Sequence, residues 1–131
     1  MAKPAVLIVE DNKINALVLR KAIEPICNPI HVVNDHETFE AIHARIFELI
    51  LMDINLGSNS LDGEAIMKII KQNPDYQAIK IFAVTGYAMP GDRERFLAAG
   101  FDGYFSKPIE KEAILEGIRN AINPDTAQAA A

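Results

Sequence analysis

Four runs of consecutive hydrophobic residues recur along the chain, separated by longer stretches in which hydrophobic and polar residues mix. The runs cover residues 5–9, 30–33, 49–52 and 81–84, and a weaker one covers residues 103–106. Continuous hydrophobicity over a short run is typical of strands in a parallel sheet that is covered on both faces. The pattern therefore predicts five short strands, most of them buried.

The stretches between these runs carry apolar residues at helical spacing. These residues are Ile14, Leu17, Val18, Ala22 and Ile26; Phe39, Ile42 and Ile46; Ala65, Ile66, Ile69 and Ile70; Phe96, Leu97 and Ala99; and Ile114, Leu115, Ile118 and Ile122. Pro25 ends or bends the first of these helices, and Gly100 stops the fourth. Because strand and helix alternate throughout, we expect an α/β fold with right-handed crossovers. The domain is predicted to span residues 1–123, followed by a flexible C-terminal tail at residues 124–131.

Composition and charge narrow the classes of function. A chain of 131 residues with a formal net charge of −5 and no run of Lys or Arg argues against nucleic-acid binding. The apolar run near the N-terminus is too short to span a membrane. A single cysteine, Cys27, cannot form an internal disulfide and suits a reducing compartment, so we expect a cytoplasmic protein. The three histidines, which lack ligand spacing, are interpreted as surface or helix-edge residues: His31, His36 and His43.

Polar residues that could carry chemistry follow the predicted strands. Glu10 and Asp11 come after the first strand, Asp53 after the third, Thr85 after the fourth and Lys107 after the fifth. In an open parallel sheet, ligands bind beyond the carboxyl ends of the strands, where the winding direction reverses. We therefore expect these five side chains to meet in one crevice.

The chemistry of this set favours a metal-assisted phosphoryl transfer. Three carboxylates repel one another and call for a cation, and oxygen ligands select a hard ion such as Mg²⁺. The Lys107 ammonium and the Thr85 hydroxyl suit the oxygens of a phosphoryl group. Asp53 is the central carboxylate and the expected nucleophile, because an aspartate can form an acyl phosphate.

Four motifs at the predicted strand ends resemble those of response-regulator receiver domains, the phosphoacceptors of two-component signalling. They are LIVEDN at residues 7–12, LILMDINL at residues 49–56, AVTGYA at residues 83–88 and FSKP at residues 105–108. Their order and spacing cover the chain from about residue 5 to residue 122. The resemblance implies a doubly wound five-stranded parallel sheet of order 2-1-3-4-5, the flavodoxin-like receiver fold.

The resemblance also implies a role for each site residue. Asp53 would be phosphorylated, Asp11 would bind Mg²⁺ directly and Glu10 through a water. Asn55 would offer its backbone carbonyl to the metal, which leaves its side chain free to tune the turnover of the phosphoryl group.

The remaining implied roles concern the phosphoryl oxygens and the switch. Lys107 would pair with the phosphoryl oxygens and precede a cis peptide bond at Pro108. Thr85 would move toward the phosphoryl group while Tyr104 swings inward. Gly86 would leave room for the phosphodonor.

One segment departs from the family pattern. The stretch at residues 56–63, after Asp53, is longer than usual and lacks the usual proline. We therefore expect this loop, which flanks the metal site, to be more flexible than its counterparts.

The resemblance implies a signalling module and not a metabolic enzyme. A histidine kinase or histidine phosphotransfer protein would donate the phosphoryl group, and phosphorylation would switch a surface of the fourth helix, fifth strand and fifth helix toward a downstream protein. Because the chain begins with Met1 and fills a complete domain, a stand-alone regulator is expected. The alternative is a receiver excised from a larger regulator or a hybrid histidine kinase.

Two other functions fit less well. An aspartyl-phosphate phosphatase needs a general acid close to the nucleophile, but Asn55 stands two residues after Asp53 and cannot serve. A flavin- or nucleotide-binding module needs a glycine-rich loop after the first strand, where this chain has Glu10 and Asp11.

Overall fold

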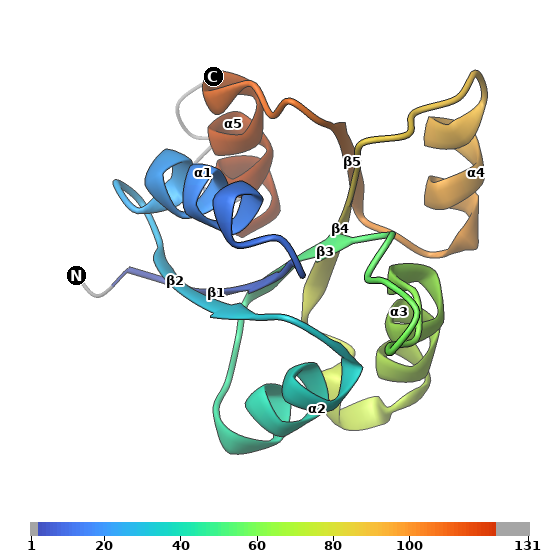
Figure 1. Ribbon diagram of the computed structural model, residues 1–131. Coiled ribbons are helices and arrows are strands. Elements are labelled where there is room, and N and C mark those ends of the chain that lie inside the picture. Colours follow the sequence, from blue (N-terminus) through green and yellow to red (C-terminus); the bar gives the residue numbers. More distant parts are fainter. Residues whose placement is uncertain (1–2, 123–131) are drawn as a thin grey trace.

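The protein folds into a five-stranded parallel sheet between two layers of helices (Figure 1). The computed structural model describes residues 3–122, so the predicted tail at residues 124–131 lies outside the described residues. The strands are β1 Ala5–Val9, β2 Asn28–Val32, β3 Leu49–Asp53, β4 Lys80–Thr85 and β5 Gly103–Ser106. Their spatial order is β2-β1-β3-β4-β5, which confirms the predicted fold class and strand order.

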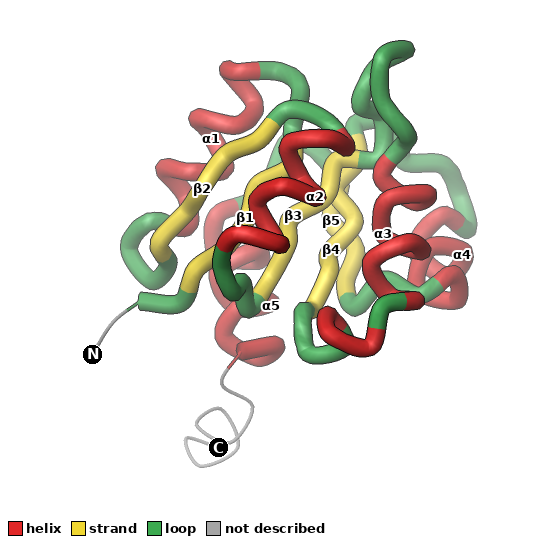
Figure 2. Tube along the Cα trace, turned by 90° about the horizontal axis from the view of Figure 1, so that it is seen from below, coloured by secondary structure: helices red, strands yellow, loops and turns green. Residues whose placement is uncertain are grey.

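In the described residues, four α-helices connect successive strands and a fifth follows β5. They are α1 Lys13–Ile23, α2 Asp35–Ala44, α3 Gly63–Gln72, α4 Asp92–Ala99 and α5 Lys111–Ile122, and the short 3₁₀ helix η1 Pro74–Tyr76 follows α3. The pair α1 and α5 covers one face of the sheet, and α2, α3 and α4 cover the other (Figure 1). In the view of Figure 2, α2 and α3 lie in front of the strands and α5 behind them. Side chains of Asn12, Asn34 and Asp62 accept backbone N–H groups at the starts of α1, α2 and α3, which fixes where these helices begin.

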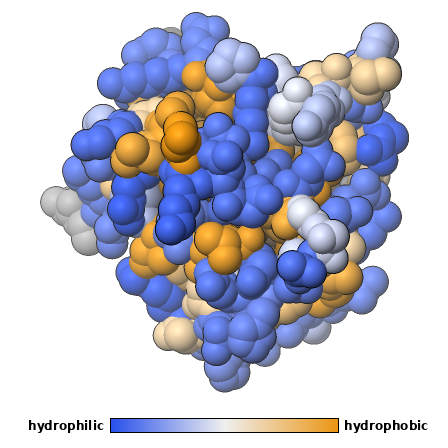
Figure 3. All heavy atoms as spheres, viewed as in Figure 1, coloured by the Kyte–Doolittle hydropathy of each residue, from blue (hydrophilic) through white to orange (hydrophobic). Residues whose placement is uncertain are grey.

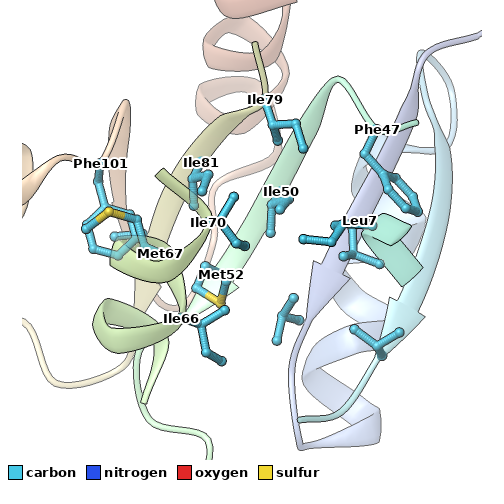
Figure 4. Close-up of a cluster of buried hydrophobic side chains, with 14 of the residues drawn as sticks. Leu7, Phe47, Ile50, Met52, Ile66, Met67, Ile70, Ile79, Ile81 and Phe101 are labelled. Atoms are coloured by element: carbon cyan, nitrogen blue, oxygen red, sulfur yellow. The ribbon is translucent and has the colours of Figure 1, made fainter. Parts of the chain in front are cut away.

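Each face of the sheet carries its own hydrophobic core. Alternate residues of a strand point to opposite faces, so Leu7 packs under α2 and α3 while Ile8 packs under α1 and α5. Figure 4 shows the larger core, in which Ile66, Met67 and Ile70 of α3 face the strands. All five residues of β3 are buried, as the continuous hydrophobic run predicted.

The apolar spacing predicted the helix α1, but three of the residues that carry this spacing do not face the sheet. Ile14, Leu17 and Val18 are 72%, 52% and 52% exposed, respectively. The residues that α1 buries are Ala16, Leu19 and Ile23. Apolar residues lie on two sides of this helix, and the side with the small Ala16 faces the sheet. Hydrophobic spacing alone did not distinguish the two sides.

A second correction concerns Ile46, which is 89% exposed and lies beyond the end of α2. Its neighbour Phe47 is buried instead and enters the larger core shown in Figure 4. Ile69 of α3 is also partly exposed, whereas Ile66 and Ile70 are buried as predicted.

The helix α4 buries fewer side chains than the other four α-helices. Of its eight residues, all of them described, Phe96 alone is buried. Gly91 and Gly100 flank the helix with positive φ angles of 84° and 131°, which favour glycine. Arg95 extends from α4 to Glu64 at the start of α3, with 3.1 Å between Nη1 and Oε1.

Within residues 3–122, no helix is both long enough and apolar enough to cross a membrane.

Candidate functional site

The carboxyl ends of the strands bring the predicted acids together. Glu10 and Asp11 follow β1, and Asp53 is the last residue of the neighbouring β3. One carboxylate oxygen from each of the three residues lies within 4.8 Å of the others. This convergence of side chains far apart in the sequence is the arrangement that the strand-end pattern predicted.

Lys107, which follows β5, reaches into the same cluster. Its Nζ lies 2.6 Å from Glu10 Oε1 and 3.4 Å from Asp53 Oδ2. The peptide bond between Lys107 and Pro108 is cis. In the described part of the chain, three carboxylates and one ammonium group thus share the cluster, which leaves an excess of negative charge.

Glu10 and Asp11 differ in burial, and the pKa of each is raised above that of a free side chain. Burial, and then the neighbouring Asp53, raises the pKa of Glu10, although Lys107 opposes the rise. Burial, and then Glu10, also raises the pKa of Asp11, which is more exposed. Burial lowers the pKa of Lys107, but the hydrogen bond that Lys107 donates to Glu10 and the charge of Asp53 outweigh it, and the net pKa is raised. Both carboxyl shifts show that the cluster disfavours its own negative charge.

The cluster lies in an open cleft of about 430 Å³. The residues that line it are Glu10, Asp11, Asn12, Asn15, Asp53, Asn55, Gly86, Tyr87 and Lys107. Asn55 donates its backbone N–H to Asp53 Oδ1 at 3.2 Å, so one oxygen of the predicted nucleophile is already oriented. The carboxylate oxygens and excess negative charge form a donor set that fits Mg²⁺ better than a softer metal.

A family model for the response regulator receiver domain matches residues 6–119 of the chain. The chain belongs to this family.

Relatives of known name agree with the match. The chain is 36% identical to the polar-differentiation response regulator DivK of Brucella anthropi over 117 residues, which are 88% of this chain and 94% of DivK. It is 34% identical to the signal transduction histidine-protein kinase BarA of Escherichia coli over 110 residues, which are 83% of this chain but 12% of BarA.

The solved receiver domain of a response regulator from Methylobacillus flagellatus has the same fold. It superposes with a TM-score of 0.80 at 23% identity, covering 92% of this chain and 99% of that chain. At this identity the likeness bears on the fold alone. The family and the names of the relatives place the receiver in two-component signalling.

The two predicted switch residues lie at different depths in this receiver. Thr85 is buried at the end of β4, and its Oγ1 accepts the backbone N–H of Tyr87 at 3.1 Å. Tyr104 on β5 is half-buried, and its ring stacks on that of Phe96 with centroids 5.9 Å apart. Thr85 is thus not among the residues that line the cleft, although the two residues that follow it, Gly86 and Tyr87, are. Tyr104 packs against Phe96 of α4.

Sequence reasoning missed the contribution of His31. This residue was interpreted as a surface histidine, but it is half-buried on β2, and its Nε2 lies 2.7 Å from the backbone carbonyl oxygen of Glu10. Because a carbonyl oxygen can only accept, Nε2 carries the hydrogen. His31 thus holds the segment that carries Glu10 and Asp11. Its position on the strand beside β1 was the one available signal. His36 and His43 are exposed on α2, as predicted.

Gly63 is a second residue whose importance the sequence did not reveal. A Cβ atom built on it would collide with the backbone oxygen of Asp53 and would lie 2.9 Å from Met52 Cγ. The start of α3 can therefore pack directly against the end of β3 only because this position has no side chain.

A larger hollow of about 500 Å³ lies between α2 and α3, away from the acids. Its lining is mostly apolar and includes Phe39, Ile69 and Tyr76. None of the strand-end residues that the sequence singled out borders this hollow.

Proposed function

We propose that this receiver accepts a phosphoryl group from a phosphohistidine donor onto Asp53 in a Mg²⁺-dependent reaction, and that the reaction switches a protein-interaction surface. The observation that carries the proposal is the surroundings of Asp53. Its carboxylate is buried at the end of a central strand, 3.4 Å from the Lys107 ammonium and within 4.8 Å of two more carboxylates.

The reaction transfers one phosphoryl group and needs no oxidant or reductant. A carboxylate oxygen of Asp53 forms a bond to phosphorus while the bond from phosphorus to the donor's imidazole nitrogen breaks. The electron pair of that bond stays on the imidazole, which takes a proton from water. Bound Mg²⁺ supplies positive charge for the phosphoryl oxygens.

The protein's own groups orient and neutralise the reactants. Asn55 N–H fixes Asp53 Oδ1, and the Lys107 ammonium, which now contacts Asp53 Oδ2, pairs with an oxygen of the arriving phosphoryl group. Asp11, Glu10 and the Asn55 backbone carbonyl are the proposed metal ligands beside Asp53, with Glu10 acting through water. Gly86 leaves space for the donor because a Cβ atom there would reach only Lys107 Cδ, at 3.8 Å.

The exposed face of α1 is the proposed contact for the donor. Ile14, Leu17 and Val18 form an apolar patch on this helix, and Asn15 of the same helix lines the cleft. Figure 3 shows apolar side chains gathered over α1, next to the hydrophilic centre of this face. A small hollow of about 130 Å³ lined by Val18 and Lys107, among others, connects the patch to the site. A histidine-bearing partner seated on this patch would hold its phosphoryl group over the cleft.

The output surface is proposed to be α4, β5 and α5. A phosphoryl group on Asp53 draws the Thr85 hydroxyl from the Tyr87 N–H, and Tyr104 then leaves Phe96 and turns inward. A downstream protein reads the rearranged surface. The donor is a histidine kinase or a histidine phosphotransfer protein, and the proposed location is the cytoplasm.

The chain spans nearly all of DivK and about an eighth of BarA. The proposed chemistry is the same for a single-domain regulator and for a receiver within a larger kinase. A phosphatase acting on a metabolite is not supported, because the exposed Asn55 occupies the position where such an enzyme needs an acid.

Intact mass after incubation with acetyl phosphate tests the proposal. With Mg²⁺ we expect the protein to gain one phosphoryl group, and without Mg²⁺ or in Asp53→Asn we expect no gain. Asp75→Asn is the matched control, because it makes the same change at an exposed acid in η1, which does not line the cleft. If Asp53→Asn and the control are labelled equally, the assignment of Asp53 fails.

A further inference from the structure

The loop between β3 and α3 is tied to the first turn of α2. The backbone N–H of Asp35 donates to Ser60 Oγ at 3.0 Å, and that hydroxyl donates to the Leu61 carbonyl at 2.8 Å. In return, the Leu61 N–H donates to Asp35 Oδ2 at 3.2 Å. Two of these hydrogen bonds join segments that are about 25 residues apart in the sequence, and the third, from Ser60 to Leu61, lies within the loop.

The same loop is fixed at both ends beside the acid cluster. Leu56 is buried, and the Gly63 N–H donates to the Ile54 carbonyl at 3.0 Å. Gly57 has a φ of +86°, and a Cβ atom built on it would lie 3.6 Å from Asp11 Oδ2, so the backbone here passes next to a proposed metal ligand. The prediction that this longer loop is more flexible did not anticipate these bonds.

We propose that Asp35 and Ser60 are positioning residues for the divalent cation, because they hold the loop in place before the cation binds. The inference rests on the proposed function, since the cation site is part of that function. Neither side chain lines the cleft or belongs to the acid cluster. Their effect therefore passes through the backbone between Asn55 and Leu61.

The physical reason is the entropy of ordering a loop. Residues 57–61 contain no proline and no buried side chain, so nothing else along this stretch restricts their backbone. If the three bonds are lost, the loop samples many conformations, and a cation that needs the Asn55 carbonyl beside Asp11 must order it during binding. A loop that is ordered in advance spares the cation this cost.

The charge of Asp35 is suited to this role. Hydrogen bonds from the backbone N–H groups of Leu61 and His36 lower the pKa of its carboxyl. The group is therefore an ionised acceptor at neutral pH, which strengthens both hydrogen bonds.

Calorimetric titration with Mg²⁺ tests the inference, using Ser60→Ala and Ser58→Ala as a matched pair. Both variants remove one hydroxyl from the same loop without changing the charge, but the Ser58 side chain makes no hydrogen bond to any described residue. We expect Ser60→Ala to raise the Kd for Mg²⁺ by about three- to tenfold and Ser58→Ala to leave it unchanged. Asp35→Ala should weaken binding at least as much as Ser60→Ala.

Two further readouts separate positioning from general damage. Amide hydrogen exchange at Leu61 should accelerate in Ser60→Ala while exchange in β1 and β3 stays as in the wild type. The maximal rate of labelling by acetyl phosphate at saturating Mg²⁺ should be unchanged, and only the Mg²⁺ concentration for half-maximal labelling should rise.

The outcomes distinguish this inference from the proposed function. Equal Mg²⁺ affinity in Ser60→Ala, Ser58→Ala and the wild type overturns the positioning role and leaves the phosphoacceptor proposal standing. A wild-type protein that binds no Mg²⁺ overturns both. A lower maximal rate with an unchanged Mg²⁺ requirement also overturns the positioning role, because it would place the effect in the chemical step.

Discussion

Asp11→Asn should stabilise the receiver in the absence of Mg²⁺. The substitution keeps the size of the side chain and removes one of three carboxylates that lie within 4.8 Å of one another. Two unit charges about 5 Å apart repel by roughly 3 kcal/mol at the dielectric near a protein surface and by less than about 1 kcal/mol in bulk water. Because Asp11 is exposed and Lys107 offsets part of the repulsion, we expect a gain of about 1–2 kcal/mol in the free energy of unfolding.

The assay is urea unfolding followed by circular dichroism, with thermal unfolding as a second measure. For a domain of this size the gain corresponds to a rise in Tm of about 3–8 °C. The gain should shrink in high salt, since salt screens exposed charges. At high Mg²⁺ concentration the wild type should be the more stable of the two proteins, because it binds the cation more tightly and is stabilised by binding.

The pH dependence follows from the raised pKa of Asp11, which has burial and Glu10 as its causes. An acid whose pKa is higher in the folded state binds its proton more tightly there, so its ionisation destabilises the fold. The penalty is absent below the unfolded pKa of about 4 and fully present above the folded pKa. The variant's advantage should therefore be seen at pH 7 and vanish at acid pH. If Asp11→Asn is no more stable than wild type at pH 7 and low salt, the three carboxylates do not carry the repulsion we infer.

Three further substitutions test the surroundings of Asp53. Gly63→Ala should lower the free energy of unfolding by about 2–4 kcal/mol, because the added methyl group collides with the Asp53 backbone. Gly86→Ala is the control and should change the free energy of unfolding little, because its methyl group would meet only Lys107 Cδ, at 3.8 Å. Equal effects of the two substitutions, measured by urea unfolding, would contradict the predicted collision at Gly63. Lys107→Ala should leave Mg²⁺ binding in place but uncouple phosphorylation from the output surface. Amide exchange in α4 and β5 would then be the same in the phosphorylated and unphosphorylated variant, and a wild-type difference that persists in the variant would count against this role of Lys107.

The sheet and its order could be predicted because a parallel sheet buried on both faces imposes a strong pattern. The continuous hydrophobic run at residues 49–52 predicted a buried strand, and all five residues of β3 are buried. Helix orientation was harder. Two sides of α1 are apolar: the side with Leu17 is exposed, whereas the side with Leu19 and Ile23 is buried. The deciding fact is how closely α1 can approach β1 and α5, which depends on three-dimensional packing and not on spacing.

The acid cluster was predictable for a different reason. Strand ends meet at one edge of the sheet, so the positions of Asp11, Asp53 and Lys107 in the sequence suffice to bring them together. The contacts of His31 and Asp35 were not predictable in this way. Each is a hydrogen bond between a side chain and a backbone group of a remote segment, and such bonds leave no periodic trace in the sequence.

The small buried contact of α4 has a consequence for the unphosphorylated receiver. One buried ring, Phe96, contributes about 2–3 kcal/mol, and the exposed pair of Arg95 with Glu64 adds little. Each 1.4 kcal/mol changes an equilibrium about tenfold, so 2–3 kcal/mol corresponds to a displaced helix in roughly one molecule in 30 to 150. If α4 is part of the output surface proposed above, the receiver should have a small basal output without phosphate.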